Sequence, residues 1–292
     1  MRGGMTAVRC VADISALLGE GPLWDVARET LWWVDIKRAR LHRHSPATGE
    51  TRFLQLDRRI TAVGLAAGGR FVACGDEGFV RLDPETGAIE PIATPEGEAP
   101  GNRFNDGKVD PLGRFWAGTM DDAEQEASGA IHCLEADGRA RRVAEGFRVP
   151  NGPAFDSAGR MYLADSALGR IYAYPAGGDA PRTLFASFRE EQGFPDGMTC
   201  DAEDHLWVAF WDGWCVRRLS PDGRIVAEVQ MPVERPTSLA FGGEGLGTLF
   251  VTSASVGLNE TALAAQPLAG GLFAFEPGMV GRPASVYGRT RG

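Results

Sequence analysis

The chain has 292 residues and a formal net charge of −9 at pH 7, and its basic residues form no long run. An acidic chain without basic clusters argues against a nucleic-acid-binding protein. No stretch approaches the roughly 18 to 20 apolar residues of a membrane span, and MRGGMTAVRC at the start has no signal-peptide core. We therefore expect a cytoplasmic protein that binds neither nucleic acid nor membranes, and the oligomeric state stays unknown.

The remaining composition favours a turn-rich fold with a buried core. Hydrophobic residues make up 43% of the chain, beside 39 glycines and 18 prolines. Five cysteines are an odd number and lie far apart in the sequence. This usage predicts free thiols in a reducing cytosol rather than a disulfide framework.

One stretch, from Val149 to Pro175, alternates short apolar runs with tight turns. It contains Asn151 and Gly152, an Asp-x-x-Gly turn at 156–159, and strand-like runs at 161–165 and 171–174. Apolar residues spaced two apart and broken by Gly and Asp turns predict strands, not helix. Two hairpins in tandem are expected here.

The same pattern recurs five more times. Aligned on the apolar run and the turn after it, the copies start at residues 20, 61, 105, 151, 196 and 237, in steps of 41, 44, 46, 45 and 41 residues. A repeat of this length with about four short strands is typical of a β-propeller blade. The sequence thus predicts an all-β, six-bladed propeller of four-stranded antiparallel blades, with residues 1–292 as a single domain.

The two ends of the chain bear on how the ring closes. Val8 to Ala12 reads as a strand without a nearby partner, and the last copy has only Pro283 to Tyr287 as a candidate fourth strand. A propeller protects its sheet edges by closing, so we expect the N- and C-terminal strands to pair in one blade. In the first blade, His42 and His44 are expected at the solvated surface.

Three loops stand out, at 120–128, 211–214 and 253–270. Each follows the second strand of its blade, so all three should lie at the face of the ring where the first strands begin. Loops on a rigid scaffold commonly carry function. Whether 120–128 and 253–270 act as a lid stays open.

One repeat position is polar in every copy and should face the central channel. It is occupied in turn by Glu20, Thr61, Asn105, Asn151, Asp196 and Thr237. A wet channel would tolerate such residues, but two carboxylates without a basic partner repel each other, and a bound cation removes that cost. Oxygen ligands suit Ca²⁺, Mg²⁺ or Mn²⁺, with Zn²⁺ also possible. Positions left open on the cation would admit water and substrate.

Other catalytic signatures are missing from the sequence. It has no His-Glu-x-x-His, Gly-x-Ser-x-Gly or Cys-x-x-Cys motif and no nucleotide-binding glycine loop. The polar ring is therefore the main candidate site.

Several segments together resemble the senescence-marker-protein/regucalcin/gluconolactonase family, in order and across nearly the whole chain. They are Gly19–Pro22, Arg103–Asp110, Gly118–Met120, Asn151–Gly152 and Pro195–Met198. The resemblance implies a six-bladed propeller with a divalent metal in its channel and hydrolysis of sugar lactones.

Residue roles follow from the resemblance position by position. It implies Glu20, Asn151 and Asp196 as metal ligands, with Asp196 also the catalytic base, and Arg103 and Asn105 as contacts to sugar hydroxyls. Animal members carry a substrate-contacting Glu shortly after the Gly-Thr-Met motif. Here that place lies near Ala123, and the acids around it are Asp121, Asp122 and Glu124. The sugar preference is therefore not carried over.

The resulting hypothesis is a sugar lactonase, a carboxylic ester hydrolase that opens a glucono-, xylono-, arabinono- or galactonolactone. Its cofactor would be one divalent metal ion, Ca²⁺ first, with Zn²⁺, Mn²⁺ or Mg²⁺ as alternatives. Two other functions stay open. An esterase, organophosphate hydrolase or other lactonase would need a more apolar rim, which Trp211 and Trp214 could supply. A non-enzymatic calcium-binding or interaction propeller would need no open metal position. The sequence does not distinguish between the lactones or the metals.

Overall fold

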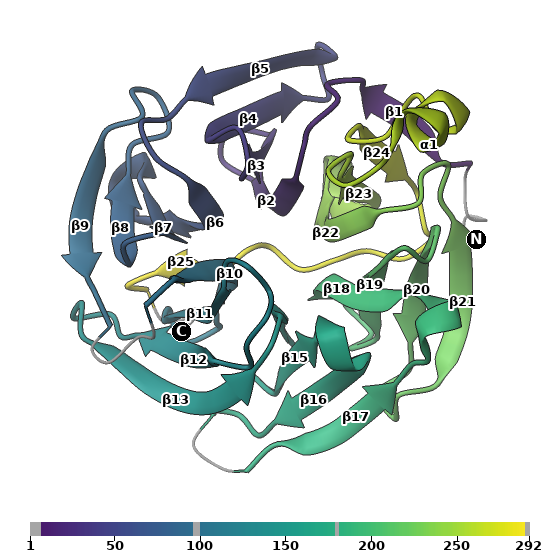
Figure 1. Ribbon diagram of the computed structural model, residues 1–292. Coiled ribbons are helices and arrows are strands. Elements are labelled where there is room, and N and C mark those ends of the chain that lie inside the picture. The colour runs from purple at the N-terminus through teal and green to yellow at the C-terminus, as the bar shows by residue number, and fades with distance from the viewer. Residues whose placement is uncertain (1–6, 96–99, 179–180, 290–292) are drawn as a thin grey trace.

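A computed structural model describes residues 7–95, 100–178 and 181–289. Six small sheets stand around a central channel like the blades of a propeller (Figure 1). Neighbouring strands within a blade run antiparallel, and the first strand of each repeat lies innermost (Figure 1). The predicted six-bladed architecture is confirmed.

The first three blades follow the chain in order. Blade one contains β2 (Gly19–Asp25), β3 (Thr30–Asp35), β4 (Arg40–Ser45) and β5 (Glu50–Gln55). Blade two contains β6 (Ile60–Ala66), β7 (Phe71–Gly75), β8 (Phe79–Leu82) and β9 (Ile89–Ala93). Blade three contains β10 (Asn102–Val109), β11 (Phe115–Asp121), β12 (Gly129–Leu134) and β13 (Ala140–Phe147).

The other blades complete the ring. Blade four contains β14 (Pro150–Phe155), β15 (Met161–Asp165), β16 (Arg170–Tyr174) and β17 (Thr183–Ser187). Blade five contains β18 (Phe194–Cys200), β19 (Leu206–Trp211), β20 (Cys215–Leu219) and β21 (Ile225–Gln230). Blade six contains β22 (Pro236–Gly242), β23 (Thr248–Ser253), β24 (Leu272–Phe275) and β1 (Arg9–Ala12). The loop between β23 and β24 contains α1 (Glu260–Ala265).

The N-terminal strand closes the ring. β1 pairs antiparallel with β24, where Cys10 lies opposite Phe273, and so becomes the outermost strand of blade six. This pairing confirms the expected closure. The candidate fourth strand at 283–287 does not join this blade, because β1 already occupies that edge. Instead β25 (Val286–Tyr287) pairs in parallel with β6 of blade two.

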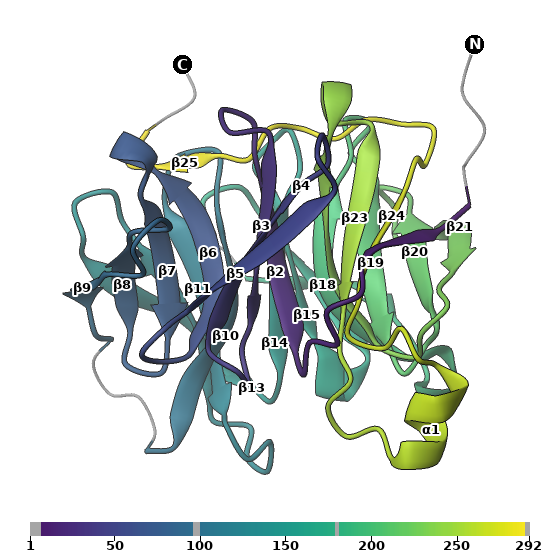
Figure 2. The ribbon, with the colours of Figure 1, turned by 90° about the horizontal axis from the view of Figure 1, so that it is seen from above.

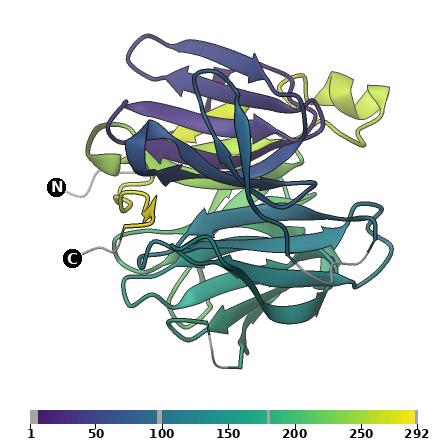
Figure 3. The same cartoon turned by 90° about the vertical axis from the view of Figure 1, so that its left-hand side faces the viewer.

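The segment before β25 crosses the ring at one face and is drawn in yellow in Figure 1. Figures 2 and 3 show the ring from the side, with the described chain ends at this face and α1 at the opposite one. The crossing segment is attached to blades five and six, where Gly281 donates to Leu246 O and Val280 O accepts from Ala202 N. Through β25 it connects these two blades with blade two, which is distant from them in the sequence.

The hydrophobic core is divided into six layers, each between two adjacent blades. Four tryptophans in these layers are almost completely buried, namely Trp32, Trp33, Trp116 and Trp207. Because the apolar side chains pack between blades, the innermost strands remain available for polar residues. The channel can therefore hold charged groups without weakening the core.

The Asp-x-x-Gly turn predicted at 156–159 is present and explains why the inner strand ends there. Asp156 Oδ1 accepts backbone N–H groups from Ala158 and Arg160, and its Oδ2 binds the Arg160 guanidinium at 2.9 Å. An aspartate that bonds the backbone two residues on is a standard device of tight turns. The turn directs the chain back into β15.

The prediction that His42 and His44 lie at the surface is wrong, since both are buried. His42 stacks on Trp33 with ring centroids 5.0 Å apart, and burial lowers the pKa of His42 to about 4. β4 is the third strand of its blade, covered by β5, which the alternating pattern alone did not show. Among the described residues, no helix is long and apolar enough to cross a membrane. The five cysteines carry free thiols.

Candidate active site at the propeller axis

Each innermost strand breaks its pairing register at the ring position. The break lies between Glu20 and Leu23 in blade one. In the other blades it lies at the equivalent points Ile60/Ala62, Phe104/Gly107, Asn151/Ala154, Pro195/Met198 and Pro236/Leu239. A β-bulge inserts a residue and re-aims side chains away from strict alternation. The repeat therefore presents consecutive polar residues to the channel.

The glycines after the ring residues serve this geometry. Gly21 and Gly152 have φ angles of +57° and +85°, a region that L side chains rarely adopt. A Cβ on Gly197 would lie 2.1 Å from Ser238 Oγ. The motif of a polar residue followed by glycine thus reflects a tight bulge and a close approach of blades five and six.

A cavity of about 470 Å³ opens at the face that carries the distinctive loops. All five predicted site residues line it: Glu20, Arg103, Asn105, Asn151 and Asp196. The ring residues Thr61 and Thr237 do not line the cavity. Instead Thr61 Oγ1 donates to Cys74 O at 3.3 Å, and Thr237 Oγ1 donates to Gly19 O. The structure thus brings together four of the six ring positions, and the threonines bond to neighbouring backbone.

The carboxyl groups of Glu20 and Asp196 are buried close to other acids. Burial raises the pKa of Glu20 well above its usual range, and the nearby Asp196 and Asp106 raise it further. Burial likewise raises the pKa of Asp196, followed by the charges of Asp106 and Glu124. Asp196 Oδ1 is buried and has no hydrogen-bond partner among the described residues. Such an arrangement is costly unless a cation or a proton neutralises it.

Asp106 is a further carboxylate that the sequence analysis did not place in the site. Its oxygens accept the N–H of Gly107 at 2.7 Å and of Gly152 at 2.9 Å. Burial raises its pKa to about 6, and the Lys108 ammonium partly opposes this rise. The repeat pattern assigns one channel residue to each blade, which is Asn105 in blade three. The bulge brings its neighbour Asp106 to the channel as well. The Asn-Asp-Gly sequence at 105–107 was the signal that could have indicated Asp106.

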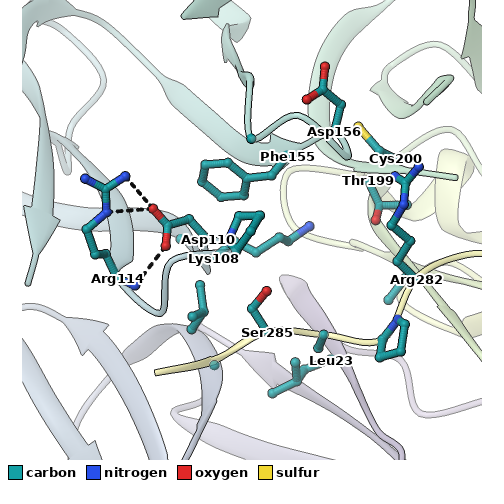
Figure 4. A pocket seen from close by; sticks show the side chains of 18 of the residues that line it. Leu23, Lys108, Asp110, Arg114, Phe155, Asp156, Thr199, Cys200, Arg282 and Ser285 are labelled. Carbon is teal, nitrogen blue, oxygen red and sulfur yellow. Dashed lines mark hydrogen bonds and ion pairs between the residues drawn. The ribbon is translucent and has the colours of Figure 1, made fainter. Parts of the chain in front are cut away.

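Lys108 belongs to a second cavity of about 410 Å³ at the opposite face, below the crossing C-terminal segment. Its Nζ donates to Met198 O at 2.7 Å. Figure 4 shows Lys108 extending between Asp110 on one side and Thr199 on the other, with Ser285 of the crossing segment nearby. Asp106 also lines this second cavity, while its charge still acts on Glu20 and Asp196.

A chain of hydrogen bonds connects the ring residues of three blades. Arg103 Nη1 donates to Asn105 Oδ1 at 3.0 Å, and Asn105 Nδ2 donates to Asn151 Oδ1 at 2.9 Å. Asn151 Nδ2 donates to Ser166 Oγ at 2.8 Å, and Ser166 Oγ donates to Pro195 O at 2.6 Å. Pro195 directly precedes Asp196. The chain of hydrogen bonds therefore links two candidate ligands through one serine.

The same bonds restrict what Arg103 and Asn105 can offer a ligand. Arg103 Nε binds Asp122 Oδ1 at 2.5 Å, so only its Nη2 has no partner among the described residues. Both amide hydrogens of Asn105 are used, by Pro150 O and by Asn151. Both residues reach the cavity, and both also hold their neighbours in place.

The expected position of the loops is confirmed. The loops after the second strands of blades three, five and six all contribute to the cavity, through Glu124, Trp211 and Val256 respectively. Of the acids around Ala123, only Glu124 lines the cavity. Asp122 instead pairs with Arg59 and Arg103. Arg148 donates twice to Glu124 O, at 3.0 and 3.1 Å, which anchors this loop to blade four.

The model of the SMP-30/gluconolactonase/LRE-like region matches residues 18–255, which include every ring residue. The chain belongs to this family.

Individual relatives agree with that assignment. A 6-deoxy-6-sulfogluconolactonase of Pseudomonas putida is 38% identical over 272 residues, covering 91% of this chain and 94% of the relative. A pentonolactonase of Haloferax volcanii is 34% identical over 290 residues, covering 96% and 97%. Among solved structures, the calcium-binding protein regucalcin of Agrobacterium tumefaciens superimposes with a TM-score of 0.90 at 29% identity, covering 98% and 97%.

The residues of this SMP-30/gluconolactonase-like site fit a hard divalent cation. In the described part of the chain no three His, Cys, Asp or Glu side chains cluster as a metal site, so a cation would need the amide oxygen of Asn151 beside the two carboxylates. Oxygen donors of this kind are the ligands that Ca²⁺ and Mg²⁺ prefer. The unpartnered Asp196 Oδ1 and the raised pKa values of both acids indicate that such a charge would stabilise the site.

Proposed function

We propose that this protein is a divalent-metal-dependent lactonase that opens a sugar lactone to its aldonic acid. The observation that carries the proposal is that Glu20, Asn151 and Asp196 line one cavity, where burial and neighbouring acids raise the pKa of both carboxyl groups. Family relatives named as a sulfogluconolactonase and a pentonolactonase support the lactone as substrate. The substrate partner is then a small sugar lactone, such as a glucono-, xylono-, arabinono- or galactonolactone.

We infer that Glu20, Asn151 and Asp196 hold the cation, with Ca²⁺ as the first choice and Zn²⁺, Mn²⁺ or Mg²⁺ as alternatives. The oxygen-only donor set and the calcium-binding relative favour Ca²⁺. When bound, the cation would polarise the lactone carbonyl and stabilise the negative charge that develops on its oxygen. Glu20 and Asp196 would supply the two negative charges that balance it.

The protein's own residues would perform the proton transfer and the positioning. Asp196 would accept a proton from the attacking water, although coordination to the cation makes its carboxylate a weaker base than it is in the metal-free protein. The same proton can then reach the ring oxygen as the C–O bond breaks, which yields one carboxylic acid and one hydroxyl. Arg103 Nη2, Asn105 Oδ1 and the Glu124 carboxylate would bind substrate hydroxyls at the wall that blade three forms.

The free thiols support a cytoplasmic location, since such cysteines persist in reducing compartments. A sugar lactone produced and consumed inside the cell would meet the enzyme there.

Substrate profiling tests the proposal. Wild-type protein and Asp196→Asn would be assayed by pH-stat against four aldonolactones, an aryl ester and an organophosphate ester. We expect turnover of at least one aldonolactone, and a loss of about 10²-fold or more in Asp196→Asn with an unchanged circular dichroism spectrum. Turnover confined to the aryl or organophosphate ester would contradict the sugar-lactone substrate. Turnover of no compound would leave a non-enzymatic propeller.

A further inference from the structure

The walls of the cavity differ in chemistry from one blade to another. Blade three contributes hydrogen-bonding groups, Arg103, Asn105 and Glu124. Blade five instead contributes two aromatic side chains, Phe194 on β18, the strand that also carries Asp196, and Trp211 on β19. Phe194 and Trp211 are directly opposite each other in the β18–β19 register, so they are neighbours. We call these two side chains the aromatic wall.

Trp211 is in contact with Arg235, which also lines the cavity. The Arg235 guanidinium carbon lies 4.7 Å from the Trp211 ring centroid, within the range of a cation–π contact. Arg235 is in turn fixed by Asp212 Oδ1 at 2.6 Å and by the carbonyl of Val256. These three residues, from two blades, thus restrict the position of the indole. A wall ordered before binding loses little conformational entropy when a ligand packs on it.

A sugar ring has a matching division of chemistry. Its hydroxyl groups project from the edge and form directional hydrogen bonds, whereas its axial C–H bonds make an apolar face. A cavity that offers polar groups on one side and a flat aromatic surface on another is suited to both features. An aryl ester would match the aromatic side alone and leave the polar groups of blade three unpaired, which costs binding energy.

We propose that the aromatic wall is the subsite against which the C–H face of the substrate ring packs, with Trp211 as its main element. The proposal rests on the sugar-lactone function and narrows it to cyclic polyhydroxylated lactones that bind with the ring intact. Trp211 would then determine specificity through substrate binding. It would take no part in proton transfer or in holding the cation.

The chain offers a matched control three residues away. Trp214 lies in the same turn as Trp211, is 37% exposed and does not line the cavity. Trp211→Ala, Trp211→Phe and Trp214→Ala would be compared with the wild type for kcat and KM on the preferred aldonolactone. Binding of 1,5-anhydro-D-glucitol, a cyclic polyol without a lactone bond, would be measured by calorimetry, and melting curves would show that each variant folds.

We expect Trp211→Ala to raise KM and weaken binding of the polyol by about ten-fold, while kcat changes much less. Trp211→Phe should restore most of the affinity because it keeps an aromatic face, and Trp214→Ala should behave as wild type. Equal, small effects of Trp211→Ala and Trp214→Ala would overturn the aromatic wall. Absence of lactone turnover in the wild type would overturn the proposed function instead, and Trp211-dependent binding of the polyol would still support the wall.

Discussion

Asn105 Nδ2 donates to Asn151 Oδ1 across 2.9 Å, and this bond joins the ring residues of two adjacent blades. The amide of Asn151 is held at both ends, since its own Nδ2 donates to Ser166 Oγ. The oxygen of Asn151 therefore cannot exchange places with its nitrogen without breaking two hydrogen bonds. We infer that Asn105 positions Asn151, in addition to any contact that Asn105 makes with the substrate.

This relationship predicts the effect of removing the Asn105 side chain. Asn105→Ala should weaken binding of Ca²⁺ by about ten-fold or more, because groups that orient a metal ligand typically contribute that much to affinity. Calorimetric titration of metal-free protein with CaCl₂ measures this directly. If Asn105 served the substrate alone, KM for the lactone would rise while the Ca²⁺ affinity stayed at the wild-type value.

A second prediction concerns Ser166, whose hydroxyl accepts from Asn151 and donates to Pro195 O at 2.6 Å. Ser166→Ala should lower Ca²⁺ affinity to a similar degree, about ten-fold, since both contacts would be lost. Ser253→Ala is the matched control, because Ser253 is also buried and donates to Gly271 O, outside the site. Equal Ca²⁺ affinities in the two variants would show that the Ser166 hydroxyl does not position the ligands.

The repeat period could be predicted from the sequence alone, whereas the register breaks could not. The six starts followed from glycine and aspartate turns that recur along the chain, because each blade must solve the same local folding problem. One repeat position then gave six polar candidates, and the family resemblance selected Glu20, Asn151 and Asp196 among them as ligands. Asp106 was missed because a bulge exposes two consecutive residues, and alternation assigns only one of them to the channel.

Other features depend on packing between distant segments. The two-residue pairing of Val286–Tyr287 with β6 has no periodic pattern to reveal it. The burial of His42 depends on β5 covering its strand and on the ring of Trp33 beneath it. The bonds that occupy Arg103 likewise involve Asp122, whose pairing with Arg103 no local pattern indicated.

A third prediction follows from the raised pKa values of the buried acids. A carboxyl group whose pKa is higher in the folded chain stabilises the fold below its unfolded pKa of about 4, and this contribution is lost as pH rises through the folded pKa. Asp106, with a pKa raised to about 6, and Asp196, raised by burial, should thus destabilise the metal-free protein as pH increases.

Asp196→Asn removes one of these charges and provides the test. At about pH 8 the metal-free variant should melt roughly 3 °C or more above metal-free wild type, and the difference should shrink toward pH 4. Addition of CaCl₂ should raise the melting temperature of the wild type and leave the variant unchanged. A variant that melts below metal-free wild type at pH 8 would show that Asp196 is not under electrostatic strain.

A fourth prediction concerns the close approach of blades five and six at Gly197. Gly197→Ala would place a Cβ 2.1 Å from Ser238 Oγ and 2.4 Å from its Cβ, and should destabilise the protein by about 1–3 kcal/mol. Chemical denaturation measures the loss. Gly247→Ala is the control, because a Cβ there would meet only Glu244 O at 3.5 Å. Comparable stability of the two variants would contradict the tight packing.

The most direct test of the central claim is lactone hydrolysis by metal-stripped protein, with Ca²⁺, Mg²⁺, Mn²⁺ and Zn²⁺ each added back. We expect the stripped wild type to be inactive, one of these ions to restore opening of an aldonolactone, and the same ion to restore nothing in Glu20→Gln. Full activity without any divalent ion, or restoration in Glu20→Gln equal to wild type, would contradict a metal-dependent lactonase built on Glu20, Asn151 and Asp196.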